Sequence, residues 1–326
     1  MGRYNGWMNT RMSVSALLVL LVAGCASAPL EVAEPAAAPG LENGSFTATL
    51  NDHLIHYEVH GSGPVLMTVP NSWGLSLAGL RALYRPLEER LTLVYFDPRG
   101  MGGSGPVVED TDMSLAAVRD DFDALRRHLG LERVNAIGWS NGATNLIYLA
   151  SERPEILDSI VFLHGVARVA PADFASFAVD YPEWAAASGQ LQQDLAREDV
   201  DDAWRTKRFR RYSLEEAYPN LFADAAVGHE MLPRVWAEAQ FSFRHGAYAQ
   251  QELPLFDLTD KLGAITARTL VVAGAHDLLP AERAEEMSAA IAGAEFVVLE
   301  NSGHFSPLEE PEAFLATVVG FFENGR

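Results

Sequence analysis

The pentapeptide GWSNG, residues Gly138 to Gly142, places one serine between two glycines, directly after the apolar run RVNAI. That run has the composition of a buried strand, and NLIYLASERP after it has the character of a helix. A sharp turn from strand to helix strains the backbone of its middle residue and requires small neighbours. We therefore expect Ser140 to expose its hydroxyl above the edge of a sheet, as a nucleophile.

The same alternation of strand and helix runs through most of the chain. We expect strands over 45–50, 53–61, 64–70, 91–97, 133–140, 158–165, 267–277 and 295–300. We expect helices over 76–90, 115–130, 145–154, 280–293 and 309–325. Apolar strands that alternate with helices predict an α/β fold, in which helices cover both faces of a mostly parallel sheet.

One long interval interrupts this alternation. Residues 167–262 are rich in aromatic and charged side chains, and no run among them resembles a strand of a parallel sheet. We interpret the interval as a helical cap inserted over the carboxyl edge of the sheet. The core then comprises residues 44–166 and 263–326. A separate interaction module is the alternative, which the return of the sheet pattern directly afterwards disfavours.

The overall charge excludes one class of function. The chain has 326 residues, a formal net charge of −20 and a pI of about 4.8. A nucleic-acid-binding protein needs a basic face to displace the counterions of phosphates. We therefore expect a small-molecule substrate and no nucleic acid.

The N-terminal region has the layout of a secretory signal peptide. An uncharged apolar run from Met12, too short to span a bilayer, follows two arginines and ends at VAGC. VAGC resembles the lipobox of bacterial lipoproteins, which implies cleavage after residue 24 and a lipid on Cys25. Residues 25–43 would then form a flexible tether to a membrane of the cell envelope, facing outside the cytoplasm. The alternative is an ordinary signal peptide cut after Ala28, which would give a secreted or periplasmic protein.

Ser140 requires a base, and the base requires an acid that orients it. Asp277 follows the expected strand TLVVAGAH, and His304 follows EFVVLENSG. The order Ser, Asp, His and the position of each residue after a strand are those of a nucleophile-elbow hydrolase. Asp257 and Asp260 are poorer candidates for the acid because they precede the strand.

The segments GWSNG, AGAHDLLP and NSGHFSPLEEP together resemble the α/β-hydrolase family, over roughly residues 46 to 326. The resemblance implies a serine hydrolase that works through an acyl-enzyme, with no metal or organic cofactor. Serine at the elbow argues against the haloalkane dehalogenase and epoxide hydrolase relatives, which use a carboxylate there.

The resemblance also implies an oxyanion hole. One donor is the backbone N–H of the residue after the nucleophile, Asn141. The second comes from the loop after the third strand, where many relatives carry His-Gly and this chain has Pro70 and Asn71. The second donor is then the N–H of Ser72 or of Trp73, and we favour Ser72.

The stretch DPRGMGGSG, residues 97–105, matches the dinucleotide-binding pattern G-x-G-x-x-G. That pattern requires a helix to begin at once, whereas Pro106 and an irregular segment follow here. The stretch resembles a loop common to α/β-hydrolases, in which Asp97 and Arg99 are structural.

The sequence leaves the function open between two classes of enzyme and a binding protein without catalytic activity. The combination of loop, elbow and cap resembles the prolyl aminopeptidase branch, whose members bind a free amino group with acids of the cap. The candidate acids here are Glu183, Glu198, Glu215 and Glu216. A carboxylesterase or lactonase would instead use an aromatic pocket, for which the candidates are Trp73, Trp139, Trp184 and Trp236. A binding protein without catalytic activity is the third possibility, which the complete triad disfavours.

Overall fold

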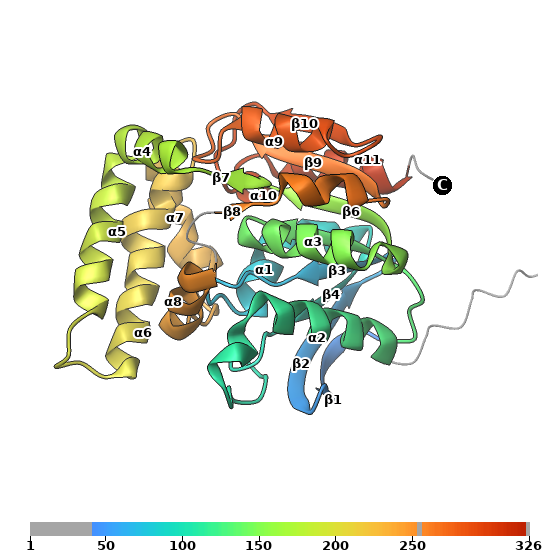
Figure 1. Cartoon of the computed structure of the whole chain (residues 1–326), viewed down its shortest axis with the longest axis horizontal. Coiled ribbons are helices and arrows are strands. Elements are labelled where there is room, and N and C mark those ends of the chain that lie inside the picture. The colour runs from blue at the N-terminus through green and yellow to red at the C-terminus, as the bar shows by residue number, and fades with distance from the viewer. Residues whose placement is uncertain (1–40, 253–255, 324–326) are drawn as a thin grey trace, which may run out of the picture. The chain divides into compact units, whose positions relative to one another are not determined.

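An eight-stranded sheet forms the centre of the computed structural model, which describes residues 41–252 and 256–323 (Figure 1). The strand order is β1-β2-β4-β3-β5-β6-β9-β10. The strands are β1 (Gly44–Leu50), β2 (His53–Gly61), β3 (Val65–Val69), β4 (Thr92–Phe96), β5 (Val134–Trp139), β6 (Leu157–Leu163), β9 (Arg268–Gly274) and β10 (Glu295–Leu299). Strand β2 pairs antiparallel with β1 and β4, and the other pairs in this sheet are parallel. The predicted signal peptide, Cys25 and most of the tether lie outside the described residues.

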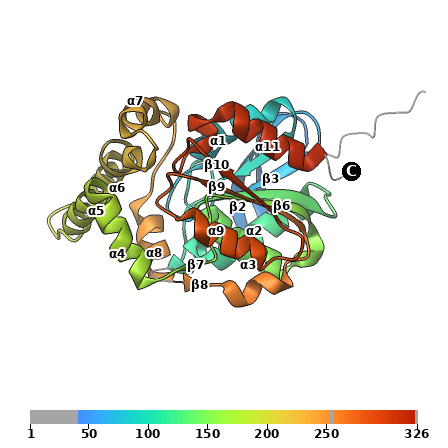
Figure 2. The same cartoon turned by 90° about the horizontal axis from the view of Figure 1, so that it is seen from above.

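Helices cover both faces of this sheet, as Figure 2 shows. One face packs against α1 (Leu77–Tyr84) and α11 (Pro311–Glu323), which the short α10 (Ser306–Glu309) precedes. The other face packs against α2 (Leu115–His128), α3 (Asn141–Glu152) and α9 (Ala281–Ala289). Neighbouring residues of β3 illustrate the two layers, because Leu66 belongs to the first apolar cluster and Met67 to the second. Burial on both faces explains why the strands are continuous apolar runs, and the predicted α/β-hydrolase fold class is confirmed.

Helices also fill the interval between β6 and β9. The helices are α4 (Pro171–Asp180), α5 (Pro182–Leu195), α6 (Asp202–Arg211), α7 (Ala225–Val235) and α8 (Phe243–Glu252). Two short strands, β7 (Arg168–Val169) and β8 (Phe256–Asp257), pair antiparallel close to the two ends of the interval. Apolar side chains of these helices join the cluster that α1 and α11 form with the sheet. We refer to this helical group, which lies to one side of the sheet in Figures 1 and 2, as the cap.

The described part of the chain contains no helix that is both long and apolar enough to cross a membrane.

Candidate active site

Ser140 stands at the turn between β5 and α3. Its backbone has φ 55° and ψ −123°, a combination that side-chain-bearing residues rarely adopt. The flanking glycines are required by space. A Cβ atom on Gly138 would lie 2.4 Å from the carbonyl oxygen of Gly142, and one on Gly142 would lie 2.7 Å from the carbonyl oxygen of Val69. The predicted strained turn is therefore present, with the N-terminus of α3 directly behind Ser140.

Asp277 and His304 follow β9 and β10, two neighbouring parallel strands. The Nδ1 atom of His304 lies 2.8 Å from Oδ1 and 3.0 Å from Oδ2 of Asp277. Ser140 and His304 line the same cavity, although no hydrogen bond joins their side chains within the described structure. Such catalytic hydrogen bonds are often long without substrate and shorten when substrate binds. The structure thus brings the three predicted residues to one end of the sheet.

Asp277 is an ionised carboxylate in a buried position. Burial alone would raise its pKa, but the adjacent His304 and hydrogen bonds from the rings of His164 and His304 outweigh that effect. The pKa of Asp277 is therefore held well below its usual range. A permanently negative group beside the ring of His304 is what stabilises an imidazolium during proton transfer.

The loop that carries His304 is fixed from three sides. The backbone N–H of His304 donates to the carbonyl oxygen of Leu221, which lies between α6 and α7, at 2.8 Å. The Glu309 carboxylate accepts from the backbone N–H groups of Gly303 and Phe305, at 3.0 and 2.9 Å. The indole N–H of Trp139 donates to the carbonyl oxygen of His304, at 2.9 Å. Core and cap therefore both determine where the imidazole stands.

Two asparagines of α3 reach the loop that was predicted to supply the second oxyanion donor. The Ser72 N–H donates to Oδ1 of Asn141 at 2.8 Å, so it is engaged in this structure. The Nδ2 atom of Asn145 lies 3.0 Å from the carbonyl oxygen of Pro70 and 2.8 Å from Oγ of Ser72. The alternative donor, the Trp73 N–H, donates to Oδ1 of Asn71. Ser72 and Asn141 are thus neighbours, and the hydrogen bond between them uses the N–H that was predicted as the second oxyanion donor.

Ser140 and His304 open into a cavity of about 450 Å³ between core and cap. Its lining is mostly aromatic and aliphatic, and Trp73, Trp139 and Trp184 all contribute to it. Trp236 does not line the cavity; it is fully buried, and its indole N–H donates to the carbonyl oxygen of Gly79. Among the described residues, no aspartate, glutamate, lysine or arginine side chain lines this cavity.

The four candidate acids of the cap do not reach the cavity. Glu183, Glu198 and Glu215 are exposed on the surface. Glu216 forms ion pairs with Arg208 and Arg211. The structure therefore provides no carboxylate at these positions to receive the amino group of a peptide substrate.

The glycine-rich loop after β4 is held by charged side chains of the core. Asp97 accepts hydrogen bonds from the N–H groups of Leu77 and Gly103, at 2.8 and 3.0 Å. Arg99 binds Asp121 through two nitrogens, at 2.7 and 2.8 Å. These contacts support the structural role expected for Asp97 and Arg99.

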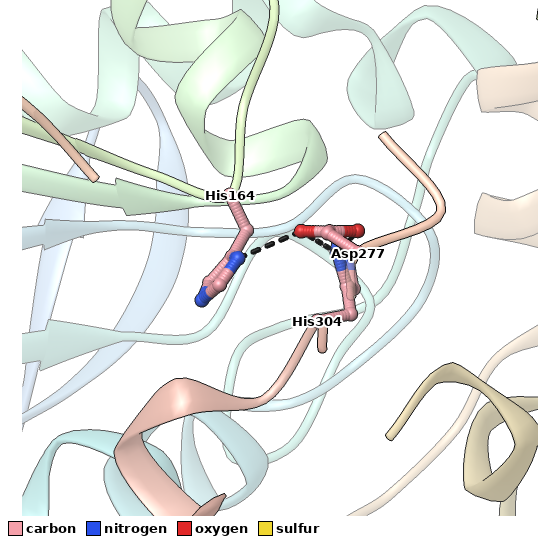
Figure 3. Close-up of side chains that lie close together, drawn as sticks. All are labelled: His164, Asp277 and His304. Atoms are coloured by element: carbon pink, nitrogen blue, oxygen red, sulfur yellow. Dashed lines mark hydrogen bonds and ion pairs between the residues drawn. The ribbon is translucent and has the colours of Figure 1, made fainter. Parts of the chain in front are cut away.

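A residue that the sequence analysis did not single out lies against Asp277 (Figure 3). His164 follows β6, and its Nδ1 atom lies 2.7 Å from Oδ2 of Asp277. Ligand atoms of His164, Asp277 and His304 lie within 4.8 Å of one another, a spacing that a metal ion could bridge. Hydrogen bonds between each ring and the carboxylate account for this spacing. One signal was available in the sequence, since His164 stands at the carboxyl end of an expected strand, the edge where ligands bind in such sheets. That β6 adjoins β9 is known only from the structure.

Comparisons with known proteins agree with this fold. The profile of the alpha/beta hydrolase fold family matches residues 69–311. A putative carbamate hydrolase RutD from Rhizobium rhizogenes is 26% identical over 273 residues, which cover 82% of this chain and 97% of that protein. A soluble epoxide hydrolase from a Corynebacterium species is 26% identical, covering 84% of this chain and 96% of that protein. The esterase EaEST from Exiguobacterium antarcticum has a similar structure, with a TM-score of 0.66 and 21% identity over 86% of this chain and all of that chain.

Proposed function

This chain belongs to the α/β-hydrolase fold family, and on that premise we propose that it is a serine hydrolase of uncharged, largely apolar carboxylic esters, lactones included. The observation that carries the proposal is the Asp277–His304 hydrogen bond, together with the cavity that both His304 and Ser140 line. The lining of that cavity supports the choice of substrate. Burying a charged group there without a partner would cost several kcal/mol.

The proposed reaction proceeds through an acyl-enzyme. His304 accepts the proton of the Ser140 hydroxyl while Oγ attacks the carbonyl carbon of the ester, and Asp277 stabilises the imidazolium. The backbone N–H groups of Asn141 and Ser72 stabilise the oxyanion. The bond to the leaving oxygen breaks as His304 returns the proton to it. Water, deprotonated by His304, then attacks the acyl-enzyme, which releases the acid and the free serine.

The relatives' reactions differ in how well they fit this site. Carbamates, named for the relative from Rhizobium rhizogenes, contain a carbonyl carbon that a serine can attack in the same way. Epoxide opening, named for the relative from Corynebacterium, fits less well because relatives of that type use a carboxylate as the nucleophile. A prolyl aminopeptidase is disfavoured because the described residues of the cavity lining include no carboxylate for the substrate's amino group.

We predict that Ser140→Ala reduces kcat for a short-chain p-nitrophenyl ester by at least about a thousandfold, because it removes the attacking oxygen. The thermal midpoint should remain nearly unchanged, since Ser140 is only partly buried. Initial rates and a melting curve test this prediction. A fluorophosphonate should react with the wild type but not with the variant, which distinguishes a catalytic serine from a protein that only binds its ligand. Proline p-nitroanilide is the comparison substrate. Its cleavage in preference to the ester would overturn the ester assignment, and undiminished ester turnover by the variant would overturn the assignment of Ser140.

We also propose that the mature protein is tethered to a membrane of the bacterial cell envelope through a lipid on Cys25. The lipobox-like VAGC and the proline- and alanine-rich segment after it support this proposal. Cys25→Ala should move the protein from the membrane fraction to the soluble fraction, and intact mass should show the acyl groups only on the wild type. Wild-type protein cleaved after Ala28 would contradict the proposal.

A further inference from the structure

A second histidine is bonded to the acid of the triad. His164 lies at the end of β6, with its side chain fully buried, and its Nδ1 atom is 2.7 Å from Oδ2 of Asp277 (Figure 3). Its Nε2 atom is 2.7 Å from Oγ of Ser306, the first residue of α10. The proposed proton transfer between Ser140 and His304 does not use this ring.

The hydrogen bonds determine the protonation state of His164. An ionised carboxylate only accepts hydrogen bonds, so Nδ1 of His164 carries the proton that Asp277 receives. In a neutral ring, Nε2 accepts from the hydroxyl of Ser306. Burial is the largest influence on the ring and lowers the pKa of His164, although Asp277 and the more distant Glu309 act in the opposite direction. The ring is therefore a neutral donor beside the triad.

Asp277 is held by hydrogen bonds to each of its oxygens. Oδ1 accepts from the Leu279 N–H at 3.0 Å and from His304 at 2.8 Å. Oδ2 accepts from His164, and is 3.0 Å from Nδ1 of His304. Both oxygens face His304 only while the carboxylate cannot rotate about its Cβ–Cγ bond. The hydrogen bond from His164 to Oδ2 opposes that rotation.

The backbone at His164 argues that this contact has a function beyond filling space. Its φ is 50°, in the left-handed region that residues with a side chain rarely occupy. The next residue, Gly165, is confined as well, because a Cβ atom there would lie 2.3 Å from Cβ of Ala143 behind the nucleophile. The turn after β6 therefore packs against the elbow and at the same time presents its histidine to the acid.

We propose that His164 is a positioning residue for catalysis, which acts through Asp277 by fixing the plane of the carboxylate that orients His304. The inference rests on the proposed function, so ester turnover by the wild type is established first. If the wild type does not hydrolyse the ester, the proposed function fails, and this result differs from a failure of the role proposed for His164.

The test compares His164→Leu with His164→Asn. Leucine fills space but donates no hydrogen bond, whereas asparagine tolerates a positive φ and can place its amide nitrogen where Nδ1 of the imidazole was. We expect His164→Leu to lower kcat by about ten- to a hundredfold, the cost of misplacing a catalytic group, with KM within about twofold. We expect the acid limb of its kcat/KM profile to move to higher pH, because a carboxylate with fewer donors attracts the imidazolium proton more strongly. His164→Asn should restore both.

Two outcomes would overturn the proposal. One is a folded His164→Leu variant with wild-type kcat and an unmoved acid limb. The other is an equal loss in both variants with the limb unmoved, which would mean that the shape of the imidazole matters and its hydrogen bond to Asp277 does not. If His164→Leu fails to fold, His164→Asn decides alone, because it keeps the bond to Asp277 and loses the one to Ser306. A folded, inactive asparagine variant would then contradict the role assigned here. The downfield proton resonance of the His304–Asp277 hydrogen bond should be kept in His164→Asn, which gives a readout independent of substrate.

Discussion

At the scale of single residues, two asparagines of α3 hold the loop over Pro70 to Trp73, which we propose to supply the second oxyanion donor. Asn141 and Asn145 lie one turn apart on α3, so both side chains point to the same neighbour. Asn145 binds Pro70 and Ser72 through its amide nitrogen, and Asn141 accepts the N–H of Ser72. The hydrogen bonds of Asn145 hold the loop in place, whereas Asn141 occupies the Ser72 N–H that the proposed oxyanion hole would use.

We therefore predict that Asn141→Ala raises kcat/KM for an ester by a few-fold, since it frees the Ser72 N–H and leaves the backbone N–H of residue 141 in place. Removing a true oxyanion donor costs about a hundred- to a thousandfold in rate, so the two roles are well separated. The measurement is kcat/KM for a p-nitrophenyl ester, with Asn145→Ala as the matched variant that loosens the loop and should slow the reaction. A loss of tenfold or more in Asn141→Ala would mean that its side chain supports catalysis, and would remove Ser72 as the second donor.

At the scale of elements, the sequence predicts the sheet better than it predicts the helix boundaries. The strands of the eight-stranded sheet lie within or close to the expected ranges, because burial on both faces leaves a run of apolar residues that is hard to mistake. The two-residue strands β7 and β8 were not expected. The helix expected over 76–90 instead ends at Tyr84 and continues as a 3₁₀ helix over Arg85–Glu89. Pro86 explains the change, since proline lacks an N–H and clashes with the preceding turn of an α-helix.

Helix α3 shows the opposite error. It was expected from residue 145, but it begins at Asn141, directly after Ser140. Gly142 and the polar residues around it weaken the helical pattern. The close approach of Gly142 to β3 and the tight turn at Ser140 fix the start of the helix instead, and these are contacts of the folded molecule.

The residues of the candidate site also differ in how well the sequence predicts them. Ser140, Asp277 and His304 could be predicted because each follows a strand, in an order that the chemistry requires. His164 also follows a strand, but a lone histidine there has many uses, and only the contact with Asp277 distinguishes it. Three of the four candidate tryptophans line the cavity, but the rest of its lining could be predicted least, since it includes cap residues such as Phe177, Phe209 and Tyr218. Which side of each cap helix faces the core depends on packing between segments distant in the sequence.

At the scale of the whole molecule, two buried groups of the site tie its stability to pH. The pKa of Asp277 is lowered in the folded state, so as pH falls the unfolded chain is protonated at this residue at a higher pH than the folded chain. Stability therefore falls as pH drops below about 4 to 5. The pKa of His164 is lowered as well, with burial as the main cause. An unfolded histidine protonates near pH 6.5, so stability also falls as pH drops below about 7 and continues to fall until the folded ring is protonated.

We accordingly predict that the free energy of unfolding decreases between pH 7.5 and pH 5.5, and that His164→Asn makes this decrease shallower. One proton taken up on unfolding contributes a slope of about 1.4 kcal/mol per pH unit, which is the largest difference the variant can show. His245, buried with a lowered pKa of its own, contributes a slope of the same sign in both proteins and serves as the common background. The window ends at pH 5.5 because protonation of the acidic surface, which underlies the net charge of −20, relieves repulsion at lower pH and acts in the opposite direction. Urea titrations of the wild type and the variant across the window provide the measurement. Parallel slopes in the two proteins would show that His164 is protonated equally in the folded and unfolded states. That result would contradict a folded-state His164 that is a neutral donor to Asp277.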